Sequence, residues 1–315
     1  MLKIGLVGVG GISGAHIPAW DEMENAELVA LCDIREERFE NYKETKRCYT
    51  DLDDMLANEE LDILDICLPT YLHADTAIKA MKMGINVICE KPISLKESDI
   101  RRVYSTANKY NVKFMVAHVL RFWPEYELLK EIYDTKKYGK LLSGTMTRLG
   151  CYPKWSWDGW MMDETRSGLV PFDLHIHDLD FLVYAFGKPE IKYQYRSKLP
   201  DQDFLTVSYD FGKFSINTEA SWYATCYPFT AEFRFQFEDA IVANENGKMT
   251  IYCRDDKIID LSQDADGDTG DINLPKSNAY ANEIHYFADC VENNKPVEIF
   301  KQAELRKVLQ ILNSL

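Results

Sequence analysis

Three short stretches of the sequence combine residue types that could carry out chemistry. Residues 5–16 read GLVGVGGISGAH, residues 89–93 read CEKPI, and a later run contains Asp173 and His177. Glycines before a helix can accommodate a phosphate group, a lysine can donate a hydrogen bond to a hydroxyl, and a histidine beside an aspartate can accept a proton. What these stretches can do depends on the strands and helices that position them.

The glycine-rich stretch has the features of a dinucleotide-binding turn. An apolar run leads into Gly8 and Gly10, and a helix is expected to follow, so that backbone N–H groups face a pyrophosphate with no side chains in the way. The third glycine of the G-x-G-x-x-G pattern is replaced by Ser13, which is small, and Gly14 follows at once. Asp33 ends the next apolar run, where a carboxylate accepts hydrogen bonds from the ribose of NAD.

A tight turn between a strand and a helix would by itself explain the glycines. The strand before them, the helix after them and the position of Asp33 favour dinucleotide binding. We predict NAD as the cofactor because a carboxylate repels the 2′-phosphate of NADP. Arg35 and Arg38 lie close enough in the sequence to keep NADP as the alternative.

Lys91 directly follows the fourth apolar run of the sequence. Open α/β sheets bind their ligands at the carboxyl ends of parallel strands, so Lys91 is predicted to face the ligand crevice and to donate a hydrogen bond to a substrate hydroxyl. The alternative is a lysine that extends into solvent after a strand, which is the commoner fate of lysines. The position at a strand end favours the functional interpretation.

Residues 171–187 predict a largely buried helix that begins near Asp173. Asp173, His177, Asp180 and Tyr184 share one stripe of this helix. Ionisable groups are costly to bury, so the stripe is predicted to line a cavity, with His177 as a proton acceptor that Asp173 orients. The alternatives are a helix-capping role for Asp173 and a core position for His177.

His175 points away from His177 on the predicted helix, and we expect it either to be structural or to support the residues that contact the substrate. Asp173 and His175 therefore do not share a helical face, and no cysteine or glutamate joins them locally. A metal site is not expected here.

The order of apolar runs and helical stretches predicts how these residues are positioned. In the first 120 residues apolar runs alternate with helical periodicity, which predicts an N-terminal Rossmann domain with a doubly wound parallel sheet covered on both faces. Gly84 is expected to end one helix, and Ser94 with Glu97 to form a capping box that starts the next.

Beyond about residue 140 the periodicity becomes strand-like. Phe233, Phe235 and Phe237 alternate with polar residues, which predicts a C-terminal α+β domain with a large, mostly antiparallel open sheet. We predict domain boundaries of 1–120 for the dinucleotide-binding domain and 121–315 for the substrate-binding and oligomerisation domain.

Composition excludes several classes of function. The 315 residues include 36 Lys and Arg against 51 Asp and Glu, a net charge of −15 that makes nucleic acid and anionic membranes poor partners. No apolar run reaches the roughly 18 residues of a membrane span, so a cytoplasmic protein is expected. The eight cysteines lack C-x-x-C spacing, so neither a disulfide framework nor a zinc site is predicted. The acidic segment 262–271 is interpreted as a solvated loop rather than a calcium site.

Five motifs follow one another along the chain. They are G-x-G at 8–10, P-T-x-x-H at 69–73, A-x-x-A-x-x-x-G-x-x-V-x-C-E-K-P at 77–92, D-x-x-x-H-x-x-D at 173–180 and NAYANEIHYFADCVENNKP at 278–296. Taken together they resemble the Gfo/Idh/MocA family of NAD(P)-dependent oxidoreductases, named for glucose–fructose oxidoreductase and inositol dehydrogenase. The resemblance covers nearly the whole chain and implies hydride transfer between NAD(P) and a ring carbinol of a sugar, cyclitol or related polyol.

The resemblance implies roles for individual residues. Lys91 resembles the family's catalytic lysine, His177 its catalytic histidine and Asp173 the aspartate that orients the substrate. A substrate hydroxyl would bond Lys91 and His177, and His177 would take its proton as the hydride leaves. The implied cofactor contacts are Gly8, Gly10, Gly11, Ile12, Asp33, Leu68, Pro69, Thr70, His73, Glu90 and Lys91.

Substrate contacts are implied for His118, Arg121 and Trp160, just past the fifth apolar run and in a tryptophan-rich stretch. Tryptophan rings can stack on a sugar ring, and packing in the core explains them equally well. Two alternative functions stay open: an NAD-dependent glycosidase that oxidises the ring transiently, and a sensor that binds NAD or sugar without catalysis. A homodimer or homotetramer through the C-terminal sheet is expected.

Overall fold

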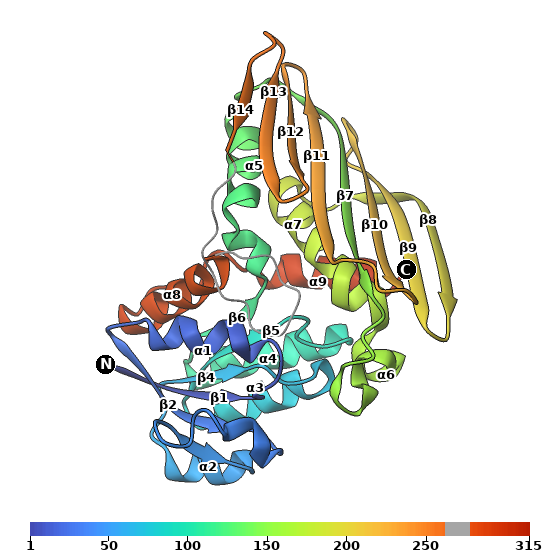
Figure 1. Cartoon of the computed structure of the whole chain (residues 1–315). Helices are drawn as coiled ribbons and strands as arrows, with labels where there is room; N and C mark the ends of the chain where they lie inside the picture. The colour runs from blue at the N-terminus through green and yellow to red at the C-terminus, as the bar shows by residue number, and fades with distance from the viewer. Residues whose placement is uncertain (262–277) are drawn as a thin grey trace. The chain divides into compact units, whose positions relative to one another are not determined.

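The computed structural model describes residues 1–261 and 278–315, which form two compact units (Figure 1). The first unit comprises residues 1–119 and a later segment that carries helix α8 (Ala279–Glu292). The second comprises residues 120–261 and 307–315. The acidic segment 262–271, predicted to be a solvated loop, lies outside the described residues.

The first unit is built on a six-stranded sheet in which every neighbouring pair is parallel. The strand order β3-β2-β1-β4-β5-β6 is the doubly wound order of a Rossmann fold and confirms the predicted fold class. The short strand β3 was not predicted, because RCY offers no apolar run. The strands are β1 (Leu2–Val7), β2 (Ala26–Cys32), β3 (Arg47–Tyr49), β4 (Ile63–Ile66), β5 (Asn86–Glu90) and β6 (Phe114–Ala117).

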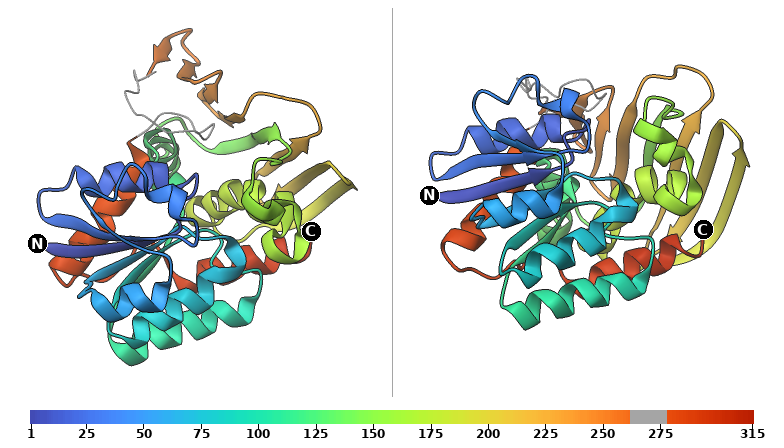
Figure 2. Two further views of the ribbon diagram at one scale, coloured as in Figure 1. Left: turned by 60° about the horizontal axis from the view of Figure 1, so that its bottom comes forward. Right: turned by 90° about the horizontal axis from the view of Figure 1, so that it is seen from below.

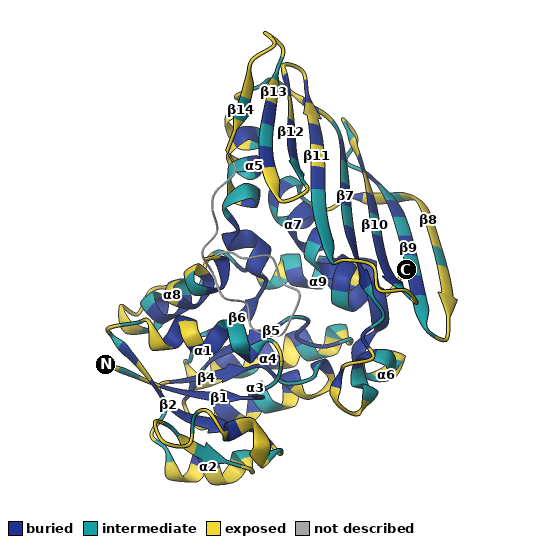
Figure 3. Ribbon diagram, viewed as in Figure 1, coloured by how far each residue is buried: buried dark blue, intermediate teal, exposed yellow. Residues whose placement is uncertain are grey.

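Helices cover both faces of this sheet, which explains its apolar strands. Figure 2 shows α1 and α8 on one face and α3 and α4 on the other, and α1 packs against α8 as α3 packs against α4. Most residues of β1, β2, β4, β5 and β6 are buried, whereas the outer sides of the helices carry exposed positions (Figure 3). These helices are α1 (Ser13–Asp21), α2 (Leu52–Asn58), α3 (His73–Lys82), α4 (Glu97–Tyr110) and α8, with the 3₁₀ turns η1 (Glu36–Phe39) and η2 (Thr70–Leu72).

The helix ends of this unit were predicted with mixed success. Gly84 has φ of +84° just after α3, as expected of a glycine at a helix end. The predicted capping box is wrong, because the N-cap position of α4 is Lys96 and not Ser94. The Ser94 hydroxyl instead donates to Asp99 at 2.7 Å and accepts the backbone N–H of Lys96, which shapes the turn that leads into the helix.

The second unit is built on an eight-stranded sheet of order β14-β13-β12-β11-β7-β10-β9-β8. Only the β7–β10 pair is parallel, so the predicted mostly antiparallel sheet is confirmed. The strands are β7 (Leu141–Cys151), β8 (Glu190–Leu199), β9 (Gln202–Asp210), β10 (Ser215–Tyr223), β11 (Thr230–Phe237), β12 (Ala240–Glu245), β13 (Lys248–Cys253) and β14 (Ile258–Asp260).

The core of this unit lies between one face of the sheet and two long helices, α5 (Pro124–Thr135) and α7 (Ile176–Phe186) (Figure 1). Phe233 and Phe235 are buried and form edge or tilted ring contacts with Tyr126 of α5 and Phe186 of α7, while Arg234 between them is exposed. The predicted alternation of buried and exposed positions is therefore confirmed.

The remaining elements are short or terminal. They are the 3₁₀ turns η3 (Val119–Phe122) and η4 (Trp157–Met162), helix α6 (Glu164–Ser167), the π turn η5 (Pro171–His175) and helix α9 (Gln302–Leu312). No helix in residues 1–261 or 278–315 is long and apolar enough to cross a membrane.

Candidate functional site

The residues predicted to bind the cofactor follow the carboxyl ends of the parallel strands. Gly8 comes after β1, Asp33 after β2, Thr70 after β4, and Glu90 ends β5 just before Lys91. Because parallel strands end at the same edge of a sheet, these residues gather along one edge of the first unit, where doubly wound folds bind ligands.

The turn between β1 and α1 leaves room for a phosphate group. Gly8 has φ of +96°, and a Cβ there would lie 2.6 Å from the carbonyl oxygen of Cys67, so only glycine fits. A Cβ at Gly10 would meet no atom within 4 Å, and Ile12 at the start of α1 offers no capping side chain. Ser13 keeps the turn compact by donating its hydroxyl to the carbonyl of Gly10 at 2.7 Å. This arrangement fits a pyrophosphate at the helix N-terminus.

Asp33 is held in place by its neighbours. Its carboxylate accepts the backbone N–H of Val9 at 2.9 Å and forms a two-pronged ion pair with the guanidinium of Arg35 at 3.0 and 3.1 Å. Arg38 donates to the carbonyl of Val9, so both backbone groups of Val9 bond residues beyond β2. The carboxylate expected to bind ribose therefore lies between a glycine turn and two arginines.

Glu90, whose role the sequence left open, has two partners inside the protein. One carboxylate oxygen accepts from Nε2 of His16 at 3.1 Å, and the other accepts the backbone N–H of Lys91 at 3.1 Å. Burial alone would raise the pKa of Glu90, but the hydrogen bond from His16 and the charges of His16 and Lys91 hold that pKa below its ordinary value. Glu90 is therefore a buried carboxylate that fixes the main chain at Lys91.

The ring of His73 also contacts the main chain. Its two ring nitrogens face the carbonyl oxygens of Pro92 at 2.7 Å and Leu68 at 2.6 Å, and burial lowers its pKa. The ring joins the loop after β4 to the loop after β5. Thr70, one turn before His73, is buried as well.

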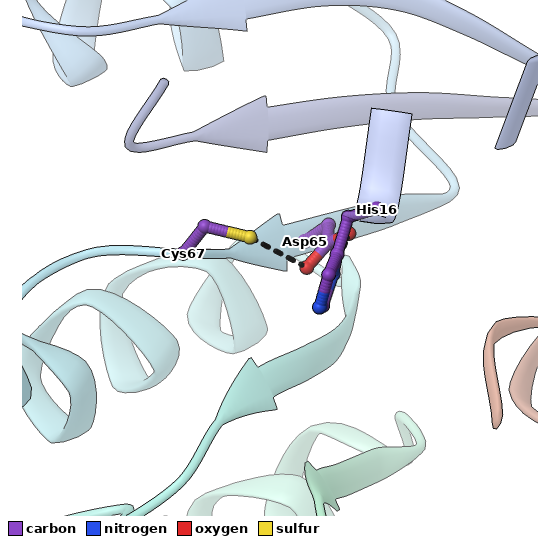
Figure 4. Close-up of side chains that lie close together, drawn as sticks. All are labelled: His16, Asp65 and Cys67. Atoms are coloured by element: carbon purple, nitrogen blue, oxygen red, sulfur yellow. Dashed lines mark hydrogen bonds and ion pairs between the residues drawn. The ribbon is translucent and has the colours of Figure 1, made fainter. Parts of the chain in front are cut away.

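A buried polar cluster at the start of α1 was not predicted. Nδ1 of His16 and Nε1 of Trp20 both donate to one oxygen of Asp65, at 2.8 and 2.7 Å. The thiol of Cys67 lies 3.6 Å from the other oxygen, and Figure 4 shows the side chains of His16, Asp65 and Cys67 close together. The sequence held one signal for it: Asp65 is a lone acid within the buried run of β4, and such a group requires a partner.

In the second unit Asp173 and His177 occupy the start of a buried helix. The chain enters as the π turn η5 and continues as α7, so the α-helix predicted from near Asp173 begins only at Ile176. Both side chains are half-buried, whereas the residues immediately beside them are buried. This exposure pattern leaves Asp173 and His177 accessible on an otherwise enclosed segment.

The prediction that Asp180 lines a cavity is wrong. Asp180 is 1% exposed and forms a two-pronged ion pair with Arg121, with both distances 2.8 Å. The ring of Tyr184 lies 4.5 Å from the same guanidinium. Arg121, predicted to contact substrate, is thus part of a buried pair between η3 and α7. The attraction within the pair offsets the cost of burying two charges.

A second buried ion pair and a histidine fix the other side of this helix. Asp178 bonds Arg148 of β7 at 2.8 Å, and Nε2 of His175 lies 2.7 Å from the hydroxyl of Tyr209 on β9. Burial and the nearby charge of Arg148 lower the pKa of His175 to about 3, so this histidine is neutral. His175 therefore attaches this helix to the sheet through Tyr209.

The other predicted substrate contacts lie in different parts of the chain. His118 is buried just after β6, with its ring 6.2 Å from that of Phe300. Trp160 is half-buried in η4, and Trp155, just before that turn, is 67% exposed. His118 belongs to the first unit and Trp160 to the second.

Comparison with protein families gives two matches along the chain. Residues 2–118 match a family described as "Oxidoreductase family, NAD-binding Rossmann fold", and residues 126–243 match the "GFO/IDH/MocA C-terminal domain". The two matched segments correspond to the Rossmann sheet with its helices and to most of the eight-stranded sheet.

Curated relatives are similar over part of their length. A 2,7-anhydro-N-acetylneuraminate hydratase from Mediterraneibacter gnavus is 31% identical over 59% of this chain and 50% of its own. A myo-inositol 2-dehydrogenase from Thermotoga maritima is 28% identical over 59% and 55%, and a glucose-6-phosphate 3-dehydrogenase from Bacillus subtilis 29% over 63% and 58%. The chain spans about half the length of the curated relatives it matches.

Solved structures share the fold over nearly the whole chain. A levoglucosan dehydrogenase in complex with NADH and levoglucosan has a TM-score of 0.83 at 18% identity, covering 99% of this chain and 95% of that one. A myo-inositol 2-dehydrogenase from Lactobacillus plantarum has a TM-score of 0.81 at 20% identity, with the same coverage. At these identities the similarity establishes the fold.

Proposed function

Because the chain belongs to the GFO/IDH/MocA family of oxidoreductases, we propose that it transfers a hydride between NAD and a ring carbinol of a sugar, cyclitol or related polyol. The observation that carries this proposal is the position of Lys91 at the end of β5, on the sheet edge that also carries the glycine turn and Asp33. The substrate class is taken from relatives named for inositol and sugar-phosphate dehydrogenases.

The cofactor contacts follow from the sheet edge. The backbone around Gly8 and Gly10 would hold the pyrophosphate, and Asp33 would accept hydrogen bonds from the adenosine ribose. Leu68, Pro69 and Thr70 follow β4, the next strand along that edge. When bound, NAD⁺ supplies the hydride acceptor that the side chains of the protein lack.

Three side chains would manage the substrate hydroxyl. Lys91 donates a hydrogen bond to it, and His177 accepts its proton as the carbon–hydrogen bond breaks. Asp173 orients the substrate and the imidazole. The hydroxyl would lose its proton to His177, and bound NAD⁺ would supply the acceptor for the hydride that leaves the carbon, so that the carbinol would become a ketone.

Replacement of Lys91 or His177 tests this assignment. In Lys91→Met and His177→Ala we expect turnover to fall by about 10²–10⁴-fold, the usual contribution of general acid–base groups. The affinity for NAD, measured by quenching of tryptophan fluorescence, should change less than about threefold, since neither side chain is needed to bind pyrophosphate or ribose.

Lys82→Met is the matched control, because Lys82 is an exposed lysine of α3. Its turnover should equal that of the unaltered protein. The substrate panel consists of inositols, hexoses, amino sugars and glycosides, each incubated with NAD or NADP. Unchanged turnover in both Lys91→Met and His177→Ala would overturn the assignment.

A redox-neutral reaction is a second candidate, because one relative is named a hydratase. In such a reaction, as in an NAD-dependent glycosidase, the ring is oxidised transiently and no net NADH accumulates. The same panel separates these functions if NADH formation, sugar release and product mass are all followed. A non-catalytic sensor would convert no member of the panel. The presence of both Lys91 and His177 argues against this function.

A further inference from the structure

The imidazole of His16 lies between two carboxylates. Its Nδ1 is 2.8 Å from Asp65 on β4, and its Nε2 is 3.1 Å from Glu90 at the end of β5. The side chains of His16 and Asp65 are fully buried, and that of Glu90 is nearly so. His16 therefore joins the helix after the glycine turn to the two strands beside it.

This geometry requires a proton on both ring nitrogens. An ionised carboxylate only accepts hydrogen bonds, so a neutral imidazole, with one N–H, would leave one nitrogen lone pair facing a carboxylate oxygen. Burial lowers the pKa of His16, but the charge of Asp65 and the bond to it outweigh burial and raise that pKa well above its ordinary value. The geometry and the direction of this pKa both favour a buried imidazolium.

The groups around this ring leave the charge nearly balanced. Asp65 faces it from β4, Cys67 from just after that strand, Glu90 from β5, and Tyr280 from α8 with ring centroids 6.2 Å apart. One imidazolium and two carboxylates leave a single negative charge, and the charge of Lys91 helps to lower the pKa of Glu90. A charge that is paired in this way can be buried at a tolerable cost.

The cluster could also be considered as a metal site, since ligand atoms of His16, Asp65 and Cys67 lie within 4.8 Å of one another. Hydrogen bonds already account for them, because Asp65 accepts from all three of His16, Trp20 and Cys67. Burial and the charge of Asp65 raise the pKa of Cys67 to about 12, which keeps the thiol protonated. A metal would have to displace these hydrogen bonds and remove the thiol proton.

The network ends at the residue proposed to act on the substrate. Glu90 uses its second oxygen to accept the backbone N–H of Lys91, and His73 bonds the carbonyl of Pro92 on the other side. The main chain that carries Lys91 is therefore fixed at both flanking residues, and on one side the support comes from His16.

We propose that His16 is a permanently charged positioning residue, which holds Glu90 and through it the main chain of Lys91. This inference rests on the proposed function for its catalytic consequence, while the charge of His16 can be tested without any substrate. Since α1 starts at the cofactor turn, His16 also links the pyrophosphate site to the strand end that carries Lys91.

The charge is measured by ¹⁵N NMR of the imidazole side chains in the whole protein, which has six histidines. We expect the His16 signals to show two protonated ring nitrogens at pH 8, where an ordinary histidine is neutral. The signals are assigned by their absence from His16→Asn. A neutral His16 ring at pH 8 would overturn the proposal.

Two amide variants test which of the two bonds positions Lys91. The amide nitrogen of asparagine is as many bonds from Cα as Nδ1 of histidine, so His16→Asn retains a donor toward Asp65. The amide nitrogen of glutamine is as many bonds from Cα as Nε2 of histidine, so His16→Gln retains a donor toward Glu90. We expect kcat to fall about tenfold to a hundredfold in His16→Asn and less than about threefold in His16→Gln, with KM for NAD nearly unchanged.

His285→Asn is the matched control, because His285 is exposed on α8, and its kcat should not change. A purely structural role would lower the unfolding temperature of both His16 variants without separating their kcat values, and that result would overturn the positioning role. If Lys91→Met left turnover intact, the proposed function would fail instead, and the NMR result would still stand.

Discussion

At the scale of single residues, we expect Arg35 and Asp33 to govern the choice of cofactor. The ion pair between them occupies the carboxylate that would bind the ribose hydroxyls of NAD. NAD binding must therefore share or displace the guanidinium of Arg35. A 2′-phosphate in the same place would meet the repulsion of Asp33 and the attraction of Arg35.

We expect the protein to prefer NAD, and Asp33→Ala to move the preference toward NADP by about tenfold or more, since it removes the repulsion and releases Arg35. Dissociation constants for both cofactors, measured by fluorescence titration, test this without a substrate. Arg35→Ala in the same background should remove the part of the gain that the released guanidinium supplies. An NAD-to-NADP affinity ratio unchanged in Asp33→Ala would refute the assignment.

Some of these residues could be predicted from the sequence and others could not. Gly8 and Asp33 could be predicted as cofactor contacts from residue type and spacing, because a positive φ or a carboxylate after a strand is a local requirement. The partners of Glu90 could not be predicted, because His16 is 74 positions away and only the sheet order brings α1 beside the end of β5.

At the scale of elements, His175 connects the π turn η5 to strand β9 of the second unit. Its ring bonds the Tyr209 hydroxyl and stacks on the tyrosine ring at an interplanar angle of 5°. Because the ring is buried and neutral in the folded state, protonation requires this contact to open. The element that carries Asp173 and His177 is thereby attached to the sheet.

This attachment predicts a loss of stability in mild acid. The pKa of His175 falls from about 6.5 in the unfolded chain to about 3 in the folded protein, so the unfolded state binds the extra proton between these values. The stabilisation is complete above pH 6.5 and is lost as the pH falls, by about 2 kcal/mol between pH 6.5 and 4.5.

The free energy of unfolding, measured by urea denaturation across this pH range, tests the effect. His175→Gln should show a shallower decline than the unaltered protein, because glutamine does not titrate. His285→Gln, which replaces an exposed histidine, should leave the decline unchanged. Equal slopes for His175→Gln and the unaltered protein would contradict the prediction.

At the scale of the whole molecule, the outer face of the eight-stranded sheet is a candidate contact between copies of the chain. Tyr193 and Tyr195 of the edge strand β8 are more than half exposed, and Tyr195 lies beside Phe204 of β9 on the face away from the core. An exposed edge strand with aromatic side chains invites association.

We expect light scattering to give a mass of two or four chains, as the sequence led us to predict. Tyr195→Glu should shift the distribution toward the single chain, because it buries a charge at the contact. Tyr110→Glu, at an exposed position at the end of α4, is the control. A single-chain mass for the unaltered protein would refute the prediction.

The sequence by itself determined the two kinds of sheet, the glycine turn, and the position of Lys91 at a strand end, because hydrophobic periodicity and turn chemistry are local properties of the chain. Only the tertiary structure decided that Asp180 pairs with Arg121, that Glu90 pairs with His16, and that α8 returns to the first unit. These pairings join residues far apart in sequence. They form because an unpaired buried charge is costly, and which charges are buried depends on the folded structure.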